Sequence, residues 1–315
     1  MTNVIDYKPF SEREVDLQYR EMLSHVMQKG KRFESIHGDL KENEGFDDNG
    51  SVDVTGYMLR YDLRNGFPLE TLRKLGLKGA IAEVVAFLNG ARTLEELTSF
   101  GVPKVFWEKS LTKEKCGIFG LDEGDMGPGA YGEVLRRMPG PNGKTFDQVL
   151  ALVNELKTRP NSRTGILSTW YSPLALGDPS QDSPREVVVA PCHGNFIRFK
   201  LYPNTKEMHM FMVPRSSDAP VGLMYNIPEW CAMGMMLAYI LGYKFTEYVV
   251  PVADAQIYNM QRSHVVEMIS RWPKALPTVT LDPDGVRENL WDFRPEDFKL
   301  SDYHPHPGMQ IPTPT

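Results

Sequence analysis

The chain has few cysteines, no long hydrophobic run and no excess of positive charge. Its three cysteines cannot all pair, and no hydrophobic segment of a secretory signal opens the 315 residues, so we expect a reducing cytoplasm as its compartment. The longest apolar stretch, Trp230 to Leu241, is shorter than the roughly 20 residues that a membrane-spanning helix needs. A net charge of −6 argues against a nucleic-acid-binding surface, which requires a basic patch.

The composition is that of a protein with a sizeable core. Hydrophobic residues make up 41% of the chain, and no Gly/Ser linker or charge block divides it, so we expect one domain over residues 1–315. His304 and His306 lie in a proline-rich tail without a third ligand, and we therefore expect no metal site.

The segment around Cys192 concentrates reactive groups. Cys192 follows the β-branched run Val187 to Val189, which predicts a thiol at the end of a buried strand. A free cysteine usually packs as a small hydrophobic residue, and for Cys192 alone that interpretation stays open. The next segment, Pro214 to Asn226, adds a cation, a hydroxyl, a carboxylate and an amide: Arg215, Ser216, Asp218 and Asn226. A guanidinium beside a thiol lowers its pKa and favours the nucleophilic thiolate.

Hydrophobic spacing predicts the elements that surround these groups. We expect helices over Ser11–Lys29, Leu77–Leu88, Thr145–Lys157 and Pro228–Leu241. We expect a strand or hairpin over Val52–Leu63, strands over Ile166–Tyr171, Glu186–Ala190 and Val249–Tyr258, and a hairpin of Phe196–Leu201 with Met208–Val213. Gln256 and Tyr258 then point to the same side of their strand, as its period of two requires. Asn226 is expected just before a helix N-terminus.

Glu83 is the one carboxylate within the apolar helical pattern from Leu77 to Leu88. A buried carboxylate is costly without a partner, so the pattern leaves two interpretations, an exposed helix edge or a functional buried acid. Burial would raise the pKa of this carboxyl toward neutrality, which suits proton transfer.

The run Gly127 to Gly132 formally matches G-x-G-x-x-G. A dinucleotide fingerprint follows a strand and opens a helix, whereas this run follows an acidic, glycine-rich loop. We therefore do not expect it to bind a nicotinamide cofactor.

The segments around Cys192 and Asn226 resemble the thymidylate synthase family and its relatives, the pyrimidine nucleotide hydroxymethylases. Further motifs run through most of the chain in the family's order: Phe67-Pro68-Leu69, Ala82 to Gly90, Gly124 to Pro128 with Tyr131-Gly132, Asn161-Ser162-Arg163, Asp254 to Tyr258 and Tyr303 to Gly308. The resemblance implies an α/β fold, a large twisted mixed sheet flanked by helices, which packs against its copy in a homodimer.

The same resemblance implies the chemistry. Attack by Cys192 at C6 of a pyrimidine nucleoside monophosphate makes C5 nucleophilic toward a one-carbon unit from 5,10-methylenetetrahydrofolate. Arg215 would activate the thiol, Glu83 would relay protons, and Tyr131 would assist loss of the C5 proton. Asn226 would contact N3 and O4 of the base, and His193 would also contact the nucleotide. Gln256 and Tyr258 would contact the sugar, and the phosphate would be bound by Ser216, Arg215 and the neighbouring subunit's Arg163. Asp218 and Trp107 would contact the folate.

Departures from the family's pattern lie at phosphate and sugar contacts. Thr164 stands where the family has a second cross-subunit arginine, Pro214 stands in place of a glutamine, and Gln256 stands in place of a histidine. The family also has a phosphate-binding arginine in the loop that corresponds to His37 to Gly50. This loop contains no arginine here, so Arg32 or another group would have to take that role. We therefore expect a deoxyuridylate (dUMP) hydroxymethylase, because rebuilt contacts favour water entry. Thymidylate synthase and a dCMP or CMP 5-hydroxymethylase are the alternatives.

Two other classes of function fit less well. A cysteine hydrolase needs a histidine base that reaches Cys192, and the adjacent His193 would point to the opposite face of a strand. A binding module without activity would have no need of Glu83, Tyr131, Cys192 and Asn226 together.

Overall fold

The computed structural model describes residues 3–34, 50–140, 143–191, 193–194 and 196–313. Cys192 and loop residues 37–49 lie outside these ranges, so the predictions for them stay predictions. The main sheet of the described residues runs in the order β1-β2-β9-β7-β6-β5, and β8 also pairs with β9. Its strands are β1 (Lys31–Glu34), β2 (Gly50–Asp62), β5 (Ile166–Leu167), β6 (Phe196–Tyr202), β7 (Glu207–Val213), β8 (Ser217–Asp218) and β9 (Lys244–Tyr258).

The sheet is mixed, as predicted. β9 pairs antiparallel with β2 but parallel with β7 and β8, and β6 and β7 form the predicted antiparallel hairpin. Two small antiparallel pairs stand apart from it, β3 (Met138–Pro139) with β4 (Thr145–Phe146) and β10 (Thr278–Leu281) with β11 (Phe298–Ser301).

Nine α-helices occur in the described residues: α1 (Gln18–Lys29), α2 (Leu77–Leu88), α3 (Leu94–Ser99), α4 (Lys113–Ile118), α5 (Tyr131–Arg137), α6 (Gln148–Thr158), α7 (Ser172–Leu176), α8 (Gly222–Leu241) and α9 (Arg262–Ser270). Short 3₁₀ turns cover Phe10–Glu12, Leu63–Asn65, Lys104–Phe106, Asn259–Gln261, Leu290–Asp292 and Pro295–Asp297. None of the helices in this part of the chain is long and apolar enough to cross a membrane.

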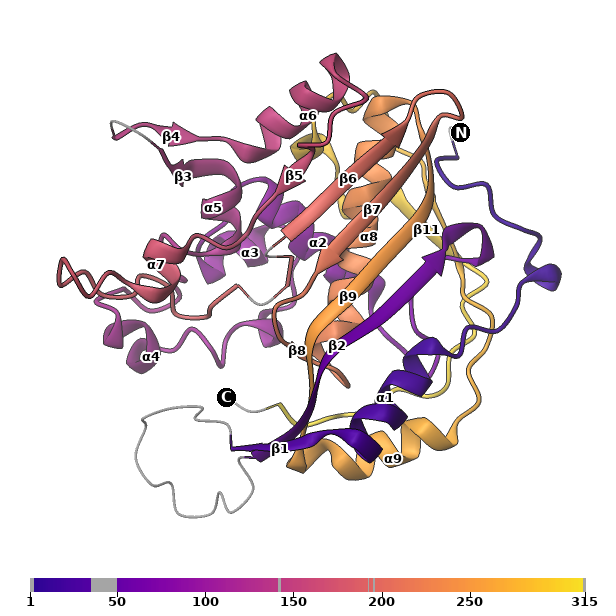
Figure 1. Ribbon diagram of the computed structural model, residues 1–315, viewed down its shortest axis with the longest axis horizontal. Helices are drawn as coiled ribbons and strands as arrows, with labels where there is room; N and C mark the ends of the chain where they lie inside the picture. Colours follow the sequence, from indigo (N-terminus) through magenta and orange to yellow (C-terminus); the bar gives the residue numbers. More distant parts are fainter. Residues whose placement is uncertain (1–2, 35–49, 141–142, 192, 195, 314–315) are drawn as a thin grey trace.

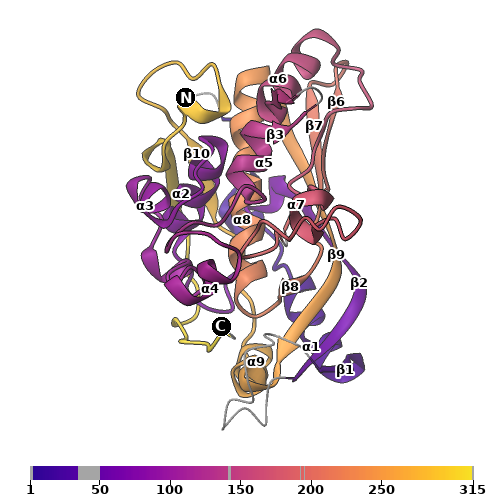
Figure 2. The ribbon, with the colours of Figure 1, turned by 90° about the vertical axis from the view of Figure 1, so that its left-hand side faces the viewer.

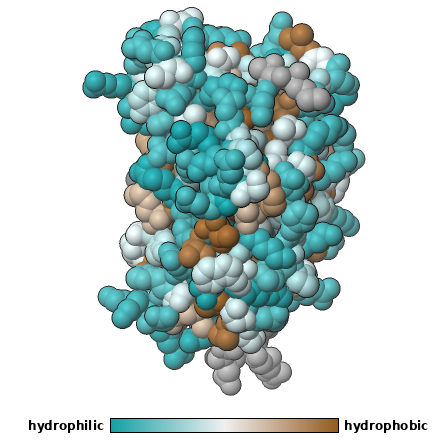
Figure 3. All heavy atoms as spheres, turned by 90° about the vertical axis from the view of Figure 1, so that its right-hand side faces the viewer, coloured by the Kyte–Doolittle hydropathy of each residue, from teal (hydrophilic) through white to brown (hydrophobic). Residues whose placement is uncertain are grey.

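Helix α8 runs along one face of the sheet (Figure 1). The turned view places α2 and α3 on that same side of β6, β7 and β9 (Figure 2). Residues of β6 and β7 alternate accordingly: Phe199 and Met210 are buried, whereas Phe196 and Phe211 keep exposed surface and pack edge to face on the opposite side of the sheet. The face in Figure 3 is mostly hydrophilic, with apolar side chains in small separate groups.

Helix α2 begins and ends where the sequence predicts, but two other helices start later than predicted. α1 begins at Gln18 rather than Ser11, and the Asp16 carboxylate accepts a hydrogen bond from the Gln18 backbone N–H at 3.0 Å. α6 begins after Asp147, whose carboxylate accepts from the Leu150 N–H at 2.9 Å. In both cases an acidic side chain satisfies an N–H group of the first turn and fixes the boundary.

Helix α8 starts six residues before the predicted Pro228, so the prediction that Asn226 precedes the helix is wrong. Asp218 accepts from the Val221 N–H at 3.1 Å and stabilises the earlier start. Pro228 then lies inside the helix, where it removes one backbone donor. The helix ends at Gly242, in the left-handed conformation that glycine adopts most easily, as predicted.

The prediction of a strand over Glu186–Ala190 is wrong, and the strand predicted over Ile166–Tyr171 is limited to Ile166–Leu167. Val187 is fully buried, but the backbone of its segment forms hydrogen bonds with loop residues instead of a neighbouring strand. The backbone of Glu186 bonds to Gly129 and Leu174, and the Val188 N–H donates to the Met126 carbonyl at 3.1 Å. β-branched residues are therefore buried here without joining the sheet.

A glycine-to-alanine pair tests the close contact between α5 and the end of α2. A Cβ on Gly132 would lie 2.4 Å from the Ala91 carbonyl oxygen, whereas one on Gly117 in α4 would meet no atom within 4 Å. We expect Gly132→Ala to lower the free energy of unfolding by about 1–3 kcal/mol. Gly117→Ala should raise it slightly, since alanine favours a helix. Equal effects in urea unfolding would contradict this account of the contact.

Candidate active site

Glu83 projects from α2 into the protein interior. Its side chain is 5% exposed, so of the two interpretations left open by the sequence, burial is correct. The Trp107 indole N–H donates to Glu83 Oε1 at 2.5 Å. Burial raises the pKa of Glu83 to about 7, and the hydrogen bond from Trp107 opposes part of that rise because it stabilises the ionised form.

Three rings stack beside this carboxyl. The Tyr131 ring lies between Phe87, at 4.8 Å between ring centroids, and His193, at 4.5 Å. Trp107 meets Phe87 and Tyr131 edge to face, 6.2 Å from each. Segments far apart in the sequence thus bring Glu83, Trp107, Tyr131 and His193 into one cluster.

His193 is held as a neutral imidazole. It is 3% exposed, and burial lowers its pKa to about 3. The Trp230 indole N–H donates to His193 Nδ1 at 2.5 Å, which assigns the ring proton to Nε2. The His193 carbonyl accepts from the Thr169 hydroxyl at 3.1 Å. The residue after Cys192 is therefore fixed from both its ring and its backbone.

Asn226 and Glu229 extend this cluster along α8. Asn226 is 9% exposed and donates through Nδ2 to Glu229 Oε2 at 3.3 Å. Glu229 is completely buried, and its Oε2 lies 3.9 Å from His193 Nε2. Sequence reasoning missed Glu229 and Trp230. The signal was a glutamate within an apolar helical run, the same one that identified Glu83.

Arg215 contacts Pro191, the residue before Cys192 in the sequence. Its Nε donates to the Pro191 carbonyl at 3.4 Å, and its guanidinium stands over the Trp170 ring, 5.2 Å from the centroid. Arg185 lies nearby, and its pKa is lowered mainly by burial and further by the positive charge of Arg215. This part of the site therefore carries concentrated positive charge, which suits an anionic ligand or a thiolate.

Ser216 and Gln256, predicted at the phosphate and the sugar, lie together where β8 and β9 pair. The Ser216 hydroxyl donates to Asp254 Oδ2 at 3.0 Å. Gln256 Nε2 donates to the same carboxylate oxygen at 2.5 Å and to the Ser216 hydroxyl at 3.0 Å. Tyr258 ends β9 and is 7% exposed. Asp254 is an additional acceptor to which the sequence analysis gave no role.

Asp218 is held beside the start of α8. Gln261 Nε2 donates to Asp218 Oδ2 at 2.9 Å, opposite the contact with the Val221 N–H. Burial raises the pKa of the Asp218 carboxyl to about 7, against these two hydrogen bonds and the nearby charge of Arg73. A carboxyl of this kind exchanges a proton near neutral pH.

Arg163 is exposed on the loop after α6. Its neighbours fix that loop, because Ser162 and Thr164 both donate to Glu155, Thr164 at 3.0 Å. Arg32 is exposed in β1. The binding of a nucleotide phosphate by Arg163 or by Arg32 stays a prediction.

The glycines of the G-x-G-x-x-G run allow close packing against another segment of the chain. A Cβ on Gly127 would lie 2.5 Å from the Glu186 carbonyl oxygen, and one on Gly129 would lie 2.9 Å from Val187 Cβ. No strand of the described residues leads directly into this run, although α5 follows it. These glycines let the loop approach the segment that leads to Cys192.

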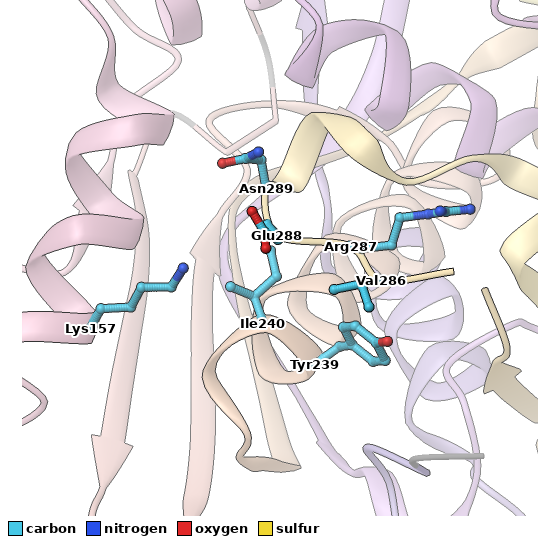
Figure 4. A pocket seen from close by; sticks show the side chains of 7 residues that line it. All are labelled: Lys157, Tyr239, Ile240, Val286, Arg287, Glu288 and Asn289. Atoms are coloured by element: carbon cyan, nitrogen blue, oxygen red, sulfur yellow. The ribbon is translucent and has the colours of Figure 1, made fainter. Parts of the chain in front are cut away.

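A separate surface pocket lies between α6, the end of α8 and the segment 286–289 (Figure 4). Its lining residues are Lys157, Tyr239, Ile240, Val286, Arg287, Glu288 and Asn289, and none of the predicted site residues is among them. The Arg287 guanidinium is engaged by Asp284 and Asp297. Among the residues that the structure describes, no group of three or more His, Cys, Asp or Glu side chains is placed to hold a metal ion.

The raised pKa of Glu83 predicts a pH-dependent stability difference. A carboxyl whose pKa is 4.5 when unfolded and about 7 when folded stabilises the fold below pH 4.5 and loses that contribution as pH rises through 7. Glu83→Gln, which stays neutral, should match the wild type at pH 4.5 and exceed its free energy of unfolding by about 3 kcal/mol at pH 8. Urea unfolding at both pH values measures this, and a difference that does not change with pH would refute the assignment.

Comparison with known proteins identifies the family of the chain. The family model described as thymidylate synthase matches residues 17–314. Thymidylate synthases from three strains of Coxiella burnetii (Dugway 5J108-111, RSA 331 / Henzerling II and RSA 493 / Nine Mile phase I) are each 33% identical over 263 residues, which cover 84% of this chain and 90% of each relative. The chain therefore belongs to the thymidylate synthase family, transferases that use methylenetetrahydrofolate as cosubstrate to transfer one carbon to C5 of a pyrimidine nucleotide.

Proposed function

We propose that this protein is a dUMP 5-hydroxymethylase, which converts dUMP, 5,10-methylenetetrahydrofolate and water to 5-hydroxymethyl-dUMP and tetrahydrofolate. The observation that carries the proposal is the buried cluster of Glu83, Trp107, Tyr131, His193 and Asn226. It combines an acid whose pKa is near 7 with neutral polar groups, as proton transfer at an uncharged pyrimidine ring requires.

The reaction begins with the Cys192 thiolate, which attacks C6 of the uracil ring and makes C5 nucleophilic. C5 then bonds to the methylene carbon of the folate while the bond of that carbon to one of its two folate nitrogens breaks. Loss of the C5 proton and cleavage of the bond to the second nitrogen release tetrahydrofolate and leave an exocyclic methylene. Water adds to this methylene as the ring expels the thiolate, and the C5 proton and one proton of the water balance the two protons that the freed nitrogens gain. Arg215 supports the first step, because it contacts the residue next to Cys192 and favours a negative charge there.

Glu83 and Tyr131 serve the proton transfers. Glu83 gives and takes protons through the polar groups around the ring. Tyr131, fixed between Phe87 and His193, assists removal of the C5 proton. Trp107 has two roles in this proposal. Its indole N–H donates to Glu83, and its ring contacts the folate, as Asp218 also does.

The nucleotide is bound at its base, sugar and phosphate. Asn226 faces N3 and O4 of uracil, with His193 beside it. Gln256 and Tyr258 contact the sugar, and Arg215 and Ser216 the phosphate. The shared hydrogen bonds of Ser216 and Gln256 with Asp254 support this arrangement, because they hold both side chains at one end of β9.

A second copy of the chain completes the phosphate site in this proposal. Arg163 is exposed, and Glu155 fixes its loop through both flanking residues, so the guanidinium is presented outward. The outer face of β6 and β7, with Phe196 and Phe211, is the surface proposed for the homodimer. We further propose one catalytic domain over residues 1–315 in the cytoplasm, which agrees with free thiols at Cys116 and Cys231.

Two observations support different products. The relatives from Coxiella burnetii are named thymidylate synthase, which favours methylation of dUMP to dTMP. The altered phosphate and sugar contacts, among them Gln256 bonded to Ser216 and Asp254, favour hydroxymethylation, because a repositioned nucleotide gives water easier access to the reacting carbon. A dCMP or CMP 5-hydroxymethylase is the remaining alternative.

Chromatography of the reaction products tests the proposed function. Purified protein with dUMP and methylenetetrahydrofolate should give 5-hydroxymethyl-dUMP and tetrahydrofolate in equal amounts. Trp107→Phe should retain the hydroxymethyl product with a lower kcat, because Glu83 loses its donor. A 5-methyl product with stoichiometric dihydrofolate would show instead that the protein is a thymidylate synthase.

A further inference from the structure

The carboxamide of Asn226 lies between two different neighbours. Nδ2 donates to Glu229 Oε2 at 3.3 Å, one turn further along α8. Oδ1 lies toward Gly222, 3.8 Å from the position that a Cβ on that glycine would take. Asn226 is 9% exposed and Glu229 is completely buried, so solvent does not compete for this contact.

The surroundings of Glu229 show that its Oε2 acts as an acceptor. Because Trp230 donates to His193 Nδ1, the proton of this imidazole is on Nε2. The Nε2 atom lies 3.9 Å from Glu229 Oε2, too far for a hydrogen bond, and the same oxygen accepts from Asn226 Nδ2 at 3.3 Å. The nitrogens nearest to Glu229 Oε2 in these two contacts are both donors, which favours the amide orientation that places Nδ2 there.

This orientation decides which base edge the amide can pair with. A carboxamide nitrogen has two hydrogens, and only one is used by Glu229. The other N–H and Oδ1 remain side by side, a donor and an acceptor that match O4 and N3–H of uracil. Rotating the amide by 180° would exchange them and match N3 and the 4-amino group of cytosine. It would also turn Oδ1 toward Glu229 Oε2, the oxygen that accepts from Nδ2 in the observed orientation, and two acceptors that face each other are costly in a buried site.

We infer that Glu229 is a specificity-determining residue: it holds the Asn226 amide in the orientation that reads uracil and opposes the one that reads cytosine. The inference rests on the proposed function, in which Asn226 contacts the base. Glu229 itself is a positioning residue, since it acts through Asn226. It adds a chemical reason for the preference for dUMP over dCMP.

Isothermal titration calorimetry with dUMP and dCMP tests the inference without requiring turnover. Glu229→Gln keeps the shape of the side chain, but its amide can donate or accept, so both orientations of Asn226 become paired. We expect the ratio of the dissociation constants for dCMP and dUMP to fall roughly ten- to a hundredfold from its wild-type value. Glu133→Gln, at a partly buried glutamate paired with Arg137, is the matched control and should leave the ratio unchanged.

Two further variants separate positioning from a structural role. Glu229→Ser, whose hydroxyl also donates and accepts, should lower the ratio in the same direction and replaces Glu229→Gln if that variant does not fold. In an Asn226→Ala background, Glu229→Gln should no longer change the ratio, because the group that it orients is absent.

The outcomes distinguish this inference from the proposed function. A wild-type preference for dUMP that neither Glu229 variant reduces, with both nucleotides weakened equally, would overturn the role of Glu229 and leave the proposed function standing. A wild-type preference for dCMP, or binding of neither nucleotide, would overturn the proposed base and this inference together.

Discussion

Burying a carboxyl group costs free energy unless hydrogen-bond donors meet it, and the interior between α2 and α8 contains two such groups, Glu83 and Glu229. Each is met by a specific donor, Trp107 for Glu83 and Asn226 for Glu229. The Trp107 contact joins α2 to a separate loop, whereas the Asn226 contact lies within α8. The position of the loop that carries Trp107 relative to α2 therefore depends on satisfying Glu83, and the placement of the Asn226 amide depends on satisfying Glu229.

The same burial sets the protonation states near neutral pH. The pKa of Glu83 rises to about 7 and that of Asp218 to about 7, whereas the pKa of His193 falls to about 3. Burial is the largest cause in all three, because a dry environment favours the uncharged form of acids and bases alike. Two carboxyl groups can thus exchange protons at neutral pH, while the imidazole between Tyr131 and Trp230 stays neutral and orients its neighbours. This division of roles suits chemistry on an uncharged ring.

The sequence predicted those parts of the fold that depend on local periodicity. Helix α2, the β6–β7 hairpin and strand β9 follow from alternating or helical spacing, and Glu83 was identified as an acid within an apolar helix. The run Glu186–Ala190 looked like a strand because Val187 and its neighbours are β-branched and buried. Its backbone partners are loop residues, which no local pattern specifies.

The candidate site shows the same division. Arg215, Ser216, Gln256 and Asn226 were identified from motifs, and the structure brings each into contact with a polar group of the site. The early start of α8, fixed by a side-chain contact from Asp218, could not be predicted from spacing. Glu229 was missed although it carried the same signal as Glu83, because its place beside His193 depends on tertiary packing that no local pattern specifies. Local sequence indicates which residues are unusual, and packing decides which of them act together.

In the proposed reaction, Cys192 and this cluster activate C5 of a uracil nucleotide. Release of tritium from dUMP labelled at C5, in the presence of methylenetetrahydrofolate, reports loss of the C5 proton whichever product forms. We expect release by the wild-type protein and none by Cys192→Ser. No release from the wild-type protein while it binds dUMP, or undiminished release from Cys192→Ser, would contradict it.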